Sequence, residues 1–367
     1  MRVMIGLSGG VDSAVSAALL KRAGAQVLGA FIKTWTPPAS LNLPAGKAGL
    51  RGASCAWRNE RRDAMRVAAH LDIPFVTIDL EKEYKESVVD YMISEYKSGR
   101  TPNPDVMCNK EIKFGAFLRK ALEMGADAIA TGHYAQIIPP SPSLMLREGR
   151  GEIQLLRGVD PAKDQSYFLW TLTQDQLSKN IFPVGHLLKS EVRELARQLR
   201  LPVASKKDSQ GICFLGDVDM KEFLSHYIKT KPGKVFEAGA RTKVIGEHEG
   251  ALFYTLGEKI LGQYVVGKDV EKNLLIVTKN HLTPTLPYNK GGQRRDIKLK
   301  DINWISGSQP NTYDLVPSTC QVRYHGEKLP CTVSGNTVTF KQPVLVAPGQ
   351  SIVFYDSNIC LGGGVVE

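Results

Sequence analysis

The sequence contains no apolar run that approaches the roughly 20 residues needed to cross a bilayer. It also has no secretory or transit signal at its start, because the chain passes at once into the strand-like run Arg2–Leu7. These two absences argue against membrane-spanning and secreted proteins. We therefore expect a cytoplasmic protein that has no membrane partner.

Paired cysteines are absent as well. The six cysteines stand alone along the chain, and none forms the CxxC pair of a zinc ribbon or a thioredoxin-type site. In a cytoplasmic protein they should be mostly reduced, each either a small buried apolar side chain or a reactive thiol. We expect a structural role for four of them: Cys55, Cys320, Cys331 and Cys360.

Positively charged side chains are in excess. The 47 lysines and arginines outnumber the 37 aspartates and glutamates, which gives a formal net charge of +10. Basic side chains that neutralise phosphates release condensed counterions, so a nucleic acid is one natural partner. A merely basic soluble enzyme fits the charge equally well.

The order of predicted elements indicates more than one domain. Up to about residue 135, apolar strand-like runs alternate with amphipathic helices, as in a parallel sheet with helices on both faces. The region 163–200 is polar and helical in pattern, and short strands between glycines and prolines dominate after Gly216. We predict an α/β domain over 1–212, a small β-rich central domain over 213–281 and a C-terminal β-barrel over 282–367. Three stretches rich in proline and glycine are predicted as surface loops: Thr36–Ala53, Pro139–Gly151 and Pro284–Arg295.

A glycine-rich loop, SGGVDS (Ser8–Ser13), follows the first predicted strand and opens a helix. Its glycines allow the backbone to approach a ligand closely, and the helix N-terminus offers free N–H groups to an anion. The spacing is neither that of a Walker A loop nor that of the dinucleotide-binding GxGxxG pattern. It resembles the PP-loop of ATP pyrophosphatases, which activate a substrate oxygen by adenylation. The loop by itself does not name the substrate.

Two further segments each carry a single cysteine in polar surroundings. In GRTPNPDVMCN, Cys108 precedes a predicted helix with Lys110 and Lys113 nearby, which would stabilise its thiolate, and Asp105 lies three residues before it. In KKDSQGICFLG, Cys213 follows a basic, glycine-containing segment that we expect to be exposed. From the residues alone, an inert structural cysteine remains possible in both places.

Together these segments resemble a known family. SGGVDS, GRTPNPDVMCN, KEIKF, ATGHY, KDQSYFLW, KKDSQGICF, PGQSIVFY and CLGGG resemble, in the same order, the motifs of the tRNA-specific 2-thiouridylases, the bacterial MnmA and mitochondrial TrmU family. The match extends over most of the chain and is weakest in the three predicted loops. The fold that it implies is a doubly wound PP-loop ATP pyrophosphatase domain, followed by the two smaller β domains.

The resemblance implies thiolation of the wobble uridine, U34, in tRNAs for Lys, Glu and Gln. In the family, ATP with Mg²⁺ adenylates O2 of the uridine, and a sulfur relay fed by a cysteine desulfurase supplies a persulfide. Cys213 matches the cysteine that carries the persulfide, and Cys108 matches the nucleophile that attacks it and leaves a disulfide. Sulfur reaches C2, and AMP departs. Asp105 matches a carboxylate that orients the base or acts on its protons. A monomer is expected.

Further site residues follow from the same motifs. The implied ATP contacts are Gly6, Leu7, Ser8, Gly9, Gly10, Val11, Asp12, Ser13, Ile32 and Gly132, the last two at strand ends on the adenine side. The implied contacts to the target base are Asn103, Pro104 and Asp105. The implied tRNA contacts are His133, Lys163, Asp164, Gln165, Arg323, Tyr324 and Gln350.

Two other functions compete with this one. A PP-loop synthetase that acts on a small carboxylate or amide would need neither the cysteines nor RNA. An RNA-binding protein that only senses ATP would fit the charge and the β-rich C-terminal half. Asp12, Asp105 and the two thiols argue against this last alternative.

Overall fold

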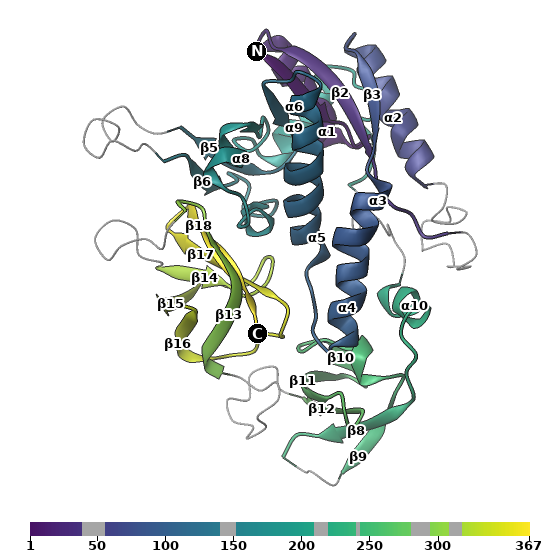
Figure 1. Cartoon of the computed structure of the whole chain (residues 1–367), viewed down its shortest axis with the longest axis vertical. Coiled ribbons are helices and arrows are strands. Elements are labelled where there is room, and N and C mark those ends of the chain that lie inside the picture. The colour runs from purple at the N-terminus through teal and green to yellow at the C-terminus, as the bar shows by residue number, and fades with distance from the viewer. Residues whose placement is uncertain (39–55, 140–151, 209–218, 240–242, 280–293, 308–317) are drawn as a thin grey trace.

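The structure is a computed structural model that describes residues 1–38, 56–139, 152–208, 219–239, 243–279, 294–307 and 318–367. It shows an N-terminal α/β domain, a small β-rich domain at the opposite end of the molecule, and a C-terminal barrel beside the long helices that run between them (Figure 1). The predicted domain boundaries near 212 and 281, and most of the three predicted loops, lie outside the described residues. The third loop was predicted two residues too long, because Arg294 and Arg295 already belong to a strand.

The N-terminal domain is built on a parallel sheet in the order β3-β2-β1-β4-β7. Its strands are β1 (Arg2–Gly6), β2 (Gln26–Lys33), β3 (Phe75–Asp79), β4 (Ala128–Ala130) and β7 (Asn180–Ile181). Side chains of β1 alternate between the two faces, with Val3 and Ile5 in one apolar cluster and Met4 in the other. Both faces therefore need a covering layer of helices.

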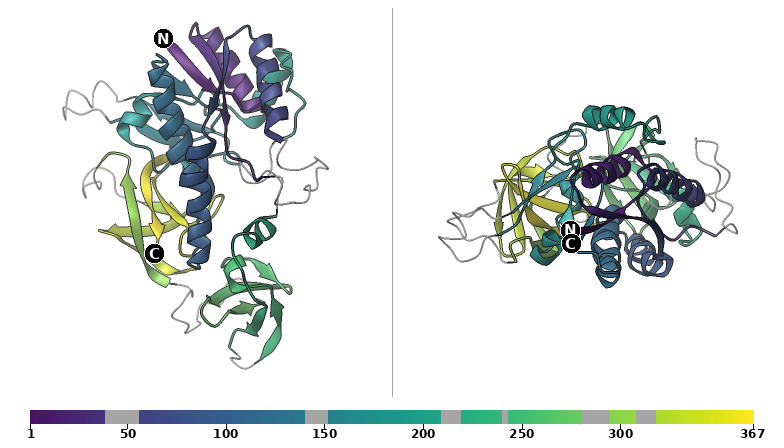
Figure 2. Two further views of the ribbon diagram at one scale, coloured as in Figure 1. Left: turned by 45° about the vertical axis from the view of Figure 1, so that its right-hand side comes forward. Right: turned by 90° about the horizontal axis from the view of Figure 1, so that it is seen from above.

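Helices cover both faces, which confirms the predicted doubly wound fold. One layer contains α1 (Val11–Arg22), α2 (Ala56–His70) and α9 (Lys189–Gln198), which share an apolar cluster with Val3 and Ile5. The other layer consists of two long helical runs: α3 (Glu81–Tyr84), η3 (Lys85–Asp90) and α4 (Tyr91–Lys97), then α5 (Pro104–Met107), η4 (Cys108–Phe117) and α6 (Leu118–Glu123). Figure 2 shows this layer continuing beyond the sheet toward the two β domains.

The polar stretch 163–200 differs from its helical prediction. It contains only short helices before α9, namely η5 (Ser166–Phe168) and α8 (Gln174–Ser178), and it supplies the edge strand β7. A two-residue strand has no periodicity of its own, and its place beside β4 comes from main-chain pairing such as Ile129 with Asn180.

The central domain follows helix α10 (Met220–Ser225) and forms a mixed sheet in the order β10-β11-β12-β8-β9. Its elements are β8 (Gly233–Glu237), β9 (Val244–His248), η6 (Ala251–Phe253), β10 (Lys259–Ile260), β11 (Gln263–Asp269) and β12 (Leu274–Thr278). The hydroxyl oxygens of Thr101 and Thr255 lie 3.2 Å apart, so this domain contacts the N-terminal domain just before α5.

The C-terminal domain is a closed six-stranded antiparallel barrel, because β13 pairs with β18 as well as with β16. Its strands are β13 (Arg294–Trp304), β14 (Thr319–Gln321), β15 (Leu329–Ser334), β16 (Thr337–Val344), β17 (Ser351–Asp356) and β18 (Ile359–Val366). Cys320, Cys331 and Cys360 are buried, as a structural role requires.

A hairpin of the N-terminal domain extends the barrel sheet. Strands β5 (Ala135–Ile138) and β6 (Gln154–Arg157) continue it beyond β18, with Leu155 opposite Cys360. The following KDQSYFLW segment also contacts the barrel: the Trp170 indole donates to the hydroxyl of Ser351, and the Tyr167 hydroxyl donates to its carbonyl. The barrel is thus held against the N-terminal domain by both main chain and side chains. Among the described residues, no helix is long and apolar enough to pass through a membrane.

Candidate active site

The glycine–serine loop lies between β1 and α1, as predicted. Gly9 has a φ of +73°, and a Cβ there would lie 2.4 Å from the carbonyl oxygen of Glu60, so only glycine fits. The hydroxyl of Ser13 donates to the Gly10 carbonyl at 3.1 Å and accepts from the Ser8 N–H at 3.3 Å. These bonds close the loop over the first turn of α1, where free N–H groups can bind an anion.

The loop lies where the sheet changes direction. From β1 the chain progresses to β2 and β3 on one side, then returns to place β4 on the other. Gly132 follows β4, and a Cβ on it would lie 2.8 Å from the Ser13 nitrogen and 2.9 Å from the Asp12 carbonyl carbon. The strand end thus packs directly on the helix N-terminus, at the position where doubly wound sheets bind their ligands.

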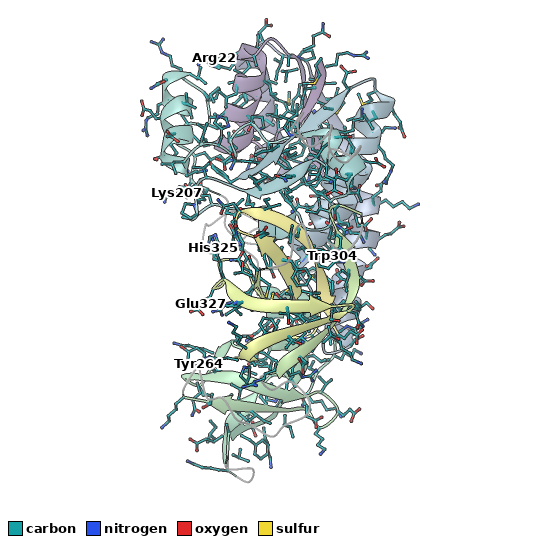
Figure 3. All side chains as sticks on the ribbon, turned by 90° about the vertical axis from the view of Figure 1, so that its left-hand side faces the viewer. Arg22, Lys207, Tyr264, Trp304, His325 and Glu327 are labelled. Atoms are coloured by element: carbon teal, nitrogen blue, oxygen red, sulfur yellow. The ribbon has the colours of Figure 1, made fainter. Side chains whose placement is uncertain are left out.

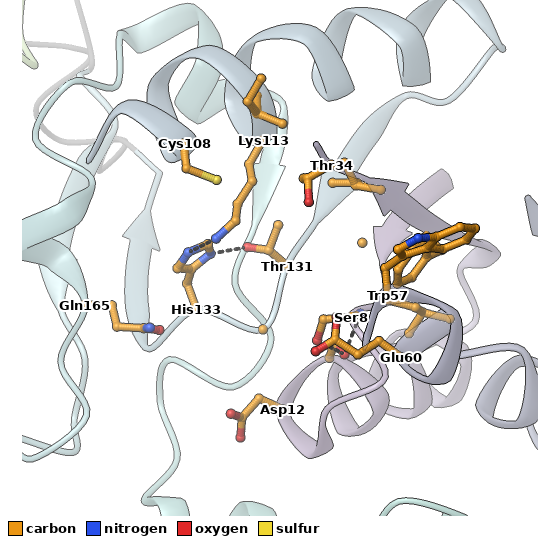
Figure 4. A pocket seen from close by; sticks show the side chains of 17 residues that line it. Ser8, Asp12, Thr34, Trp57, Glu60, Cys108, Lys113, Thr131, His133 and Gln165 are labelled. Atoms are coloured by element: carbon orange, nitrogen blue, oxygen red, sulfur yellow. Dashed lines mark hydrogen bonds between the residues drawn. The ribbon is translucent and has the colours of Figure 1, made fainter. Parts of the chain in front are cut away.

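A cavity of about 240 Å³ opens at this point. Its lining combines the phosphate loop with residues after β2, β4 and the start of η4 (Figure 4). It contains these predicted site residues: Gly6, Leu7, Ser8, Asp12, Ser13, Ile32, Cys108, Gly132, His133 and Gln165. The structure therefore brings Cys108 into the same cavity as the loop.

Cys108 differs from its predicted setting. The helix begins at Pro104, with the Asn103 side chain accepting from the N–H groups of Asp105 and Val106, so Cys108 lies one turn inside it. The prediction of a thiol at the helix N-terminus was wrong, because the capping Asn103 starts the helix earlier. Cys108 is 2% exposed. The helix dipole acts on it less than expected, since that effect fades beyond the first turn.

Lys113 is the lysine of this helix that lines the cavity together with Cys108. Element η4 is π-helical, and its i→i+5 hydrogen bonding widens each turn. In an ordinary α-helix, residues five apart point about 140° away from one another. Here Cys108 and Lys113 both line the cavity, and Figure 4 shows their side chains on the same side of it. The backbone geometry therefore places a thiol and an ammonium group on the lining of one cavity.

His133 connects this lysine to the end of β4. Its Nε2 lies 3.3 Å from Nζ of Lys113, and its Nδ1 lies 2.7 Å from Oγ1 of Thr131. Burial lowers the pKa of His133 well below its usual value, and the charge of Lys113 lowers it further. The ring is therefore neutral near pH 7. Because the ammonium donates to Nε2, the ring proton is on Nδ1 and is donated to Thr131.

Asp12 is held by groups from distant parts of the chain. Its Oδ1 accepts from the Tyr134 hydroxyl at 2.8 Å and from Nζ of Lys189 at 2.6 Å. Lys189 also lies 3.0 Å from Asp208, which pairs in addition with Lys163 at 2.7 Å. Burial by itself would raise the pKa of Asp208, but Lys163 and Lys189 lower it well below the usual range. A network of alternating charges thus extends from the phosphate loop to residue 208.

The segment before Cys213 contacts the loop directly. Lys206 donates to the Gly9 carbonyl at 3.0 Å and pairs with Asp63 of α2 at 2.9 Å. Glu60, which lines the cavity, has its pKa raised by burial, while Lys206 opposes that rise. Figure 3 shows Lys207 on the same side of the molecule as His325 and Glu327 of the barrel. Cys213 itself lies outside the described residues.

The barrel holds the segment that precedes Cys108. Gln350 donates to the carbonyl of Thr101 at 2.8 Å, and the Thr101 N–H donates to the Pro348 carbonyl at 2.7 Å. Gly349 has a φ of +90°, and a Cβ on it would lie 2.9 Å from the Thr101 carbonyl oxygen. The predicted target-base residues Asn103, Pro104 and Asp105 are therefore positioned by the C-terminal domain.

The other predicted tRNA contacts are divided between the surface and the interior. Arg323 is exposed, and the half-buried Tyr324 has its pKa raised to about 12 by burial and by nearby Asp164 and Asp105. Asp164 is 7% exposed and pairs with Arg157 at 2.9 Å. Gln165 accepts from the Tyr134 N–H at 3.0 Å.

Sequence reasoning missed several residues of the site: Lys189, Lys206, Glu60, Trp57, Thr131 and Tyr134. Lys189 comes from a helical segment that has no pattern of its own, whereas Lys206 is the first residue of the KKDSQGICF motif. For Tyr134 and Thr131, the ATGHY motif gave a usable signal, since it contains both.

The fold and the loop define the class: a HUP-type α/β domain with a phosphate-binding loop at the switch point of its sheet. A family model described as the tRNA methyl transferase HUP domain matches residues 1–217. Models described as a tRNA methyl transferase PRC-barrel domain and an aminomethyltransferase beta-barrel domain match residues 221–279 and 294–366.

Full-length relatives give the particular family. A tRNA-specific 2-thiouridylase MnmA of Alkaliphilus oremlandii is 44% identical over 382 residues, which cover 100% of this chain and 97% of the relative. The MnmA of Nitrosomonas europaea is 42% identical over 383 residues, covering 100% and 98%. The chain belongs to the tRNA-specific 2-thiouridylase family. The word methyl transferase describes only the separate domain models, whereas these relatives match all three domains together.

One similar solved structure is a 4-thiouridine synthetase–RNA complex with bound ATP. It is 18% identical, covers 59% of this chain and 45% of its own, and has a TM-score of 0.34. A likeness this partial has no bearing on activity.

Proposed function

We propose that this chain is an ATP-dependent tRNA-uridine 2-sulfurtransferase that converts U34 of tRNAs for Lys, Glu and Gln to 2-thiouridine. The observation that carries the proposal is the position of Cys108 in the same cavity as the phosphate loop. A synthetase acting on a small acid would need an activating loop but no thiol beside it. The relatives named as 2-thiouridylases support the same reaction.

Activation uses the loop side of the cavity. Oxygen at C2 of a pyrimidine is a poor leaving group, so O2 attacks the α-phosphate of ATP and pyrophosphate departs. The N–H groups at the start of α1 and the hydroxyls of Ser8 and Ser13 would hold the phosphates. Mg²⁺ is commonly bound through one or two carboxylates plus substrate phosphates, and Asp12 is the loop carboxylate that fits this role.

Sulfur transfer uses the opposite side. A sulfur-relay protein or a cysteine desulfurase would load Cys213 as a persulfide. The Cys108 thiolate attacks the inner sulfur, a Cys108–Cys213 disulfide forms, and the released hydrosulfide adds to C2. AMP then leaves with the former O2. Lys113 stabilises the thiolate before the attack and the developing negative charge afterwards. Asn103, Pro104 and Asp105 would hold the base, with Asp105 acting on its protons.

The RNA would reach this end of the cavity along the face where the N-terminal domain meets the barrel. The proposed contacts are His133, Lys163, Asp164, Gln165, Arg323, Tyr324 and Gln350. Arg323 is exposed there, whereas Asp164 and His133 are buried in this structure and would act through neighbouring groups.

The test is the nucleoside content of tRNA after incubation with ATP, Mg²⁺ and sulfide or a persulfide donor. Cys108→Ala and Cys213→Ala should each abolish 2-thiouridine formation with the persulfide donor while leaving ATP binding intact. Cys360→Ala, which alters a buried barrel thiol, is the matched control and should keep activity. A normal rate for either variant would refute the two-cysteine mechanism. Pyrophosphate release stimulated by a small acid without tRNA would favour the synthetase.

A further inference from the structure

The cavity has a side that the sulfur chemistry does not use. The phosphate loop occupies its middle, and Figure 4 shows Cys108 and His133 across from Trp57 and Thr34. This second side is lined by Phe31, Ile32 and Thr34 from the end of β2 and by Trp57 from the first turn of α2. It is mainly aromatic and apolar.

The order of the reacting groups decides what this side holds. In the proposed reaction the α-phosphate lies between the uridine and the ribose of ATP. The uridine must lie next to Cys108, and the phosphates must lie at the loop. The nucleoside of ATP therefore extends away from Cys108, toward Trp57.

Two cationic side chains flank the indole of Trp57. Nζ of Lys33 lies 5.4 Å from the ring centroid and Cζ of Arg58 lies 5.8 Å from it, both within the range of cation–π attraction. Lys33 is itself bound by Asp79 at 2.9 Å and by Glu81. The ring also lines the cavity, where it offers a flat apolar surface on which a base can stack.

We propose that the Trp57 indole stacks on the adenine of ATP and is the main determinant of nucleotide affinity on this side of the cavity. The inference rests on the proposed function, because it takes ATP as the activating nucleotide. Stacking of a base on an aromatic side chain contributes about 1–3 kcal/mol, which corresponds to roughly a fivefold to a hundredfold change in affinity.

The experiment measures two ligands by calorimetry on the full chain. One is α,β-methylene-ATP, which has the base, and the other is inorganic tripolyphosphate, which lacks it. Trp57→Ala should weaken binding of α,β-methylene-ATP by roughly fivefold to a hundredfold and leave tripolyphosphate within about twofold. Trp57→Phe, which keeps a ring, should retain most of the affinity. Trp304→Phe, in the barrel, is the control and should bind both ligands as the native chain does.

Fluorescence gives a second measurement. α,β-Methylene-ATP should quench the tryptophan emission of the native chain and of Trp304→Phe, but not that of Trp57→Phe. If Trp57→Ala bound α,β-methylene-ATP as tightly as the native chain does, the stacking inference would be overturned and the proposed function would stand. The same would follow if Trp57→Ala lost equal affinity for α,β-methylene-ATP and for tripolyphosphate. If the native chain bound tripolyphosphate but not α,β-methylene-ATP, the proposed use of ATP would fail, and this inference with it.

Discussion

Replacing Gly132 by alanine tests whether the end of β4 sets the geometry of the phosphate loop. The added Cβ would lie 2.8 Å from the Ser13 nitrogen, 2.9 Å from the Asp12 carbonyl carbon and 3.1 Å from the Asp12 Cβ. The two nearest atoms belong to the backbone, so no flexible side chain can move aside. Overpacking of this kind costs about 1–3 kcal/mol. The strand end and the first turn of α1 must separate by several tenths of an ångström.

That cost can act on ligand binding or on folding, and both can be measured. If the loop is displaced, the affinity for tripolyphosphate and for α,β-methylene-ATP should fall by roughly fivefold to a hundredfold, measured by calorimetry. If the fold absorbs the strain instead, Tm should fall by about 2–4 °C for each kcal/mol lost. Gly267→Ala is the control, because its added methyl would have its nearest contact at 3.4 Å. Native affinity together with native Tm in Gly132→Ala would refute the close packing of β4 on α1.

Three further predictions test the surrounding contacts. His133 binds no proton near pH 6 in the folded chain but does so in the unfolded chain. Between pH 7.5 and 5.5, the free energy of unfolding of the native chain should therefore drop by about 1.4 kcal/mol more than that of His133→Gln. If urea melts gave the same drop for both proteins, the buried neutral ring would be contradicted. Lys189→Met leaves Asp12 facing Asp208 without their shared ammonium, so Tm measured by calorimetry should fall by several degrees. Lys189→Arg should recover part of this loss. An unchanged Tm in Lys189→Met would rule the network out as a stabilising feature. Gln350→Leu removes a hydrogen bond from the barrel to Thr101, so the thiolation rate should fall roughly fivefold while ATP affinity stays unchanged. A matching loss of ATP affinity would mean that Gln350 supports the phosphate loop instead.

Local patterns predicted much of the N-terminal fold correctly. The apolar runs that became β1 to β4 and the amphipathic pattern of α2 were visible because their periodicity reports which faces are buried. Elements with no periodicity were missed. The hairpin β5–β6 and the strand β7 consist of two to four residues each, and only their pairing partners make them strands.

The start of the helix that carries Cys108 shows a related failure. The helix was predicted to start after Cys108, whereas Pro104 fits the first turn of a helix and the Asn103 side chain caps it. The cap starts the helix at Pro104 and places Cys108 inside it. The sequence named Lys113 as a neighbour of the thiol, but the π-helical turn that directs its side chain into the same cavity has no signature in the sequence.

The sequence by itself determined the glycine–serine loop after the first strand and the alternation that makes a doubly wound sheet, because each depends on neighbouring residues. Only the tertiary structure decided that Cys108, Gly132 and Trp57 line one cavity. It also decided that Lys189 joins Asp12 to Asp208, 196 residues apart along the chain. Strand order and domain contacts bring these residues close together in space. Both depend on the burial of apolar surface shared by segments far apart in the sequence.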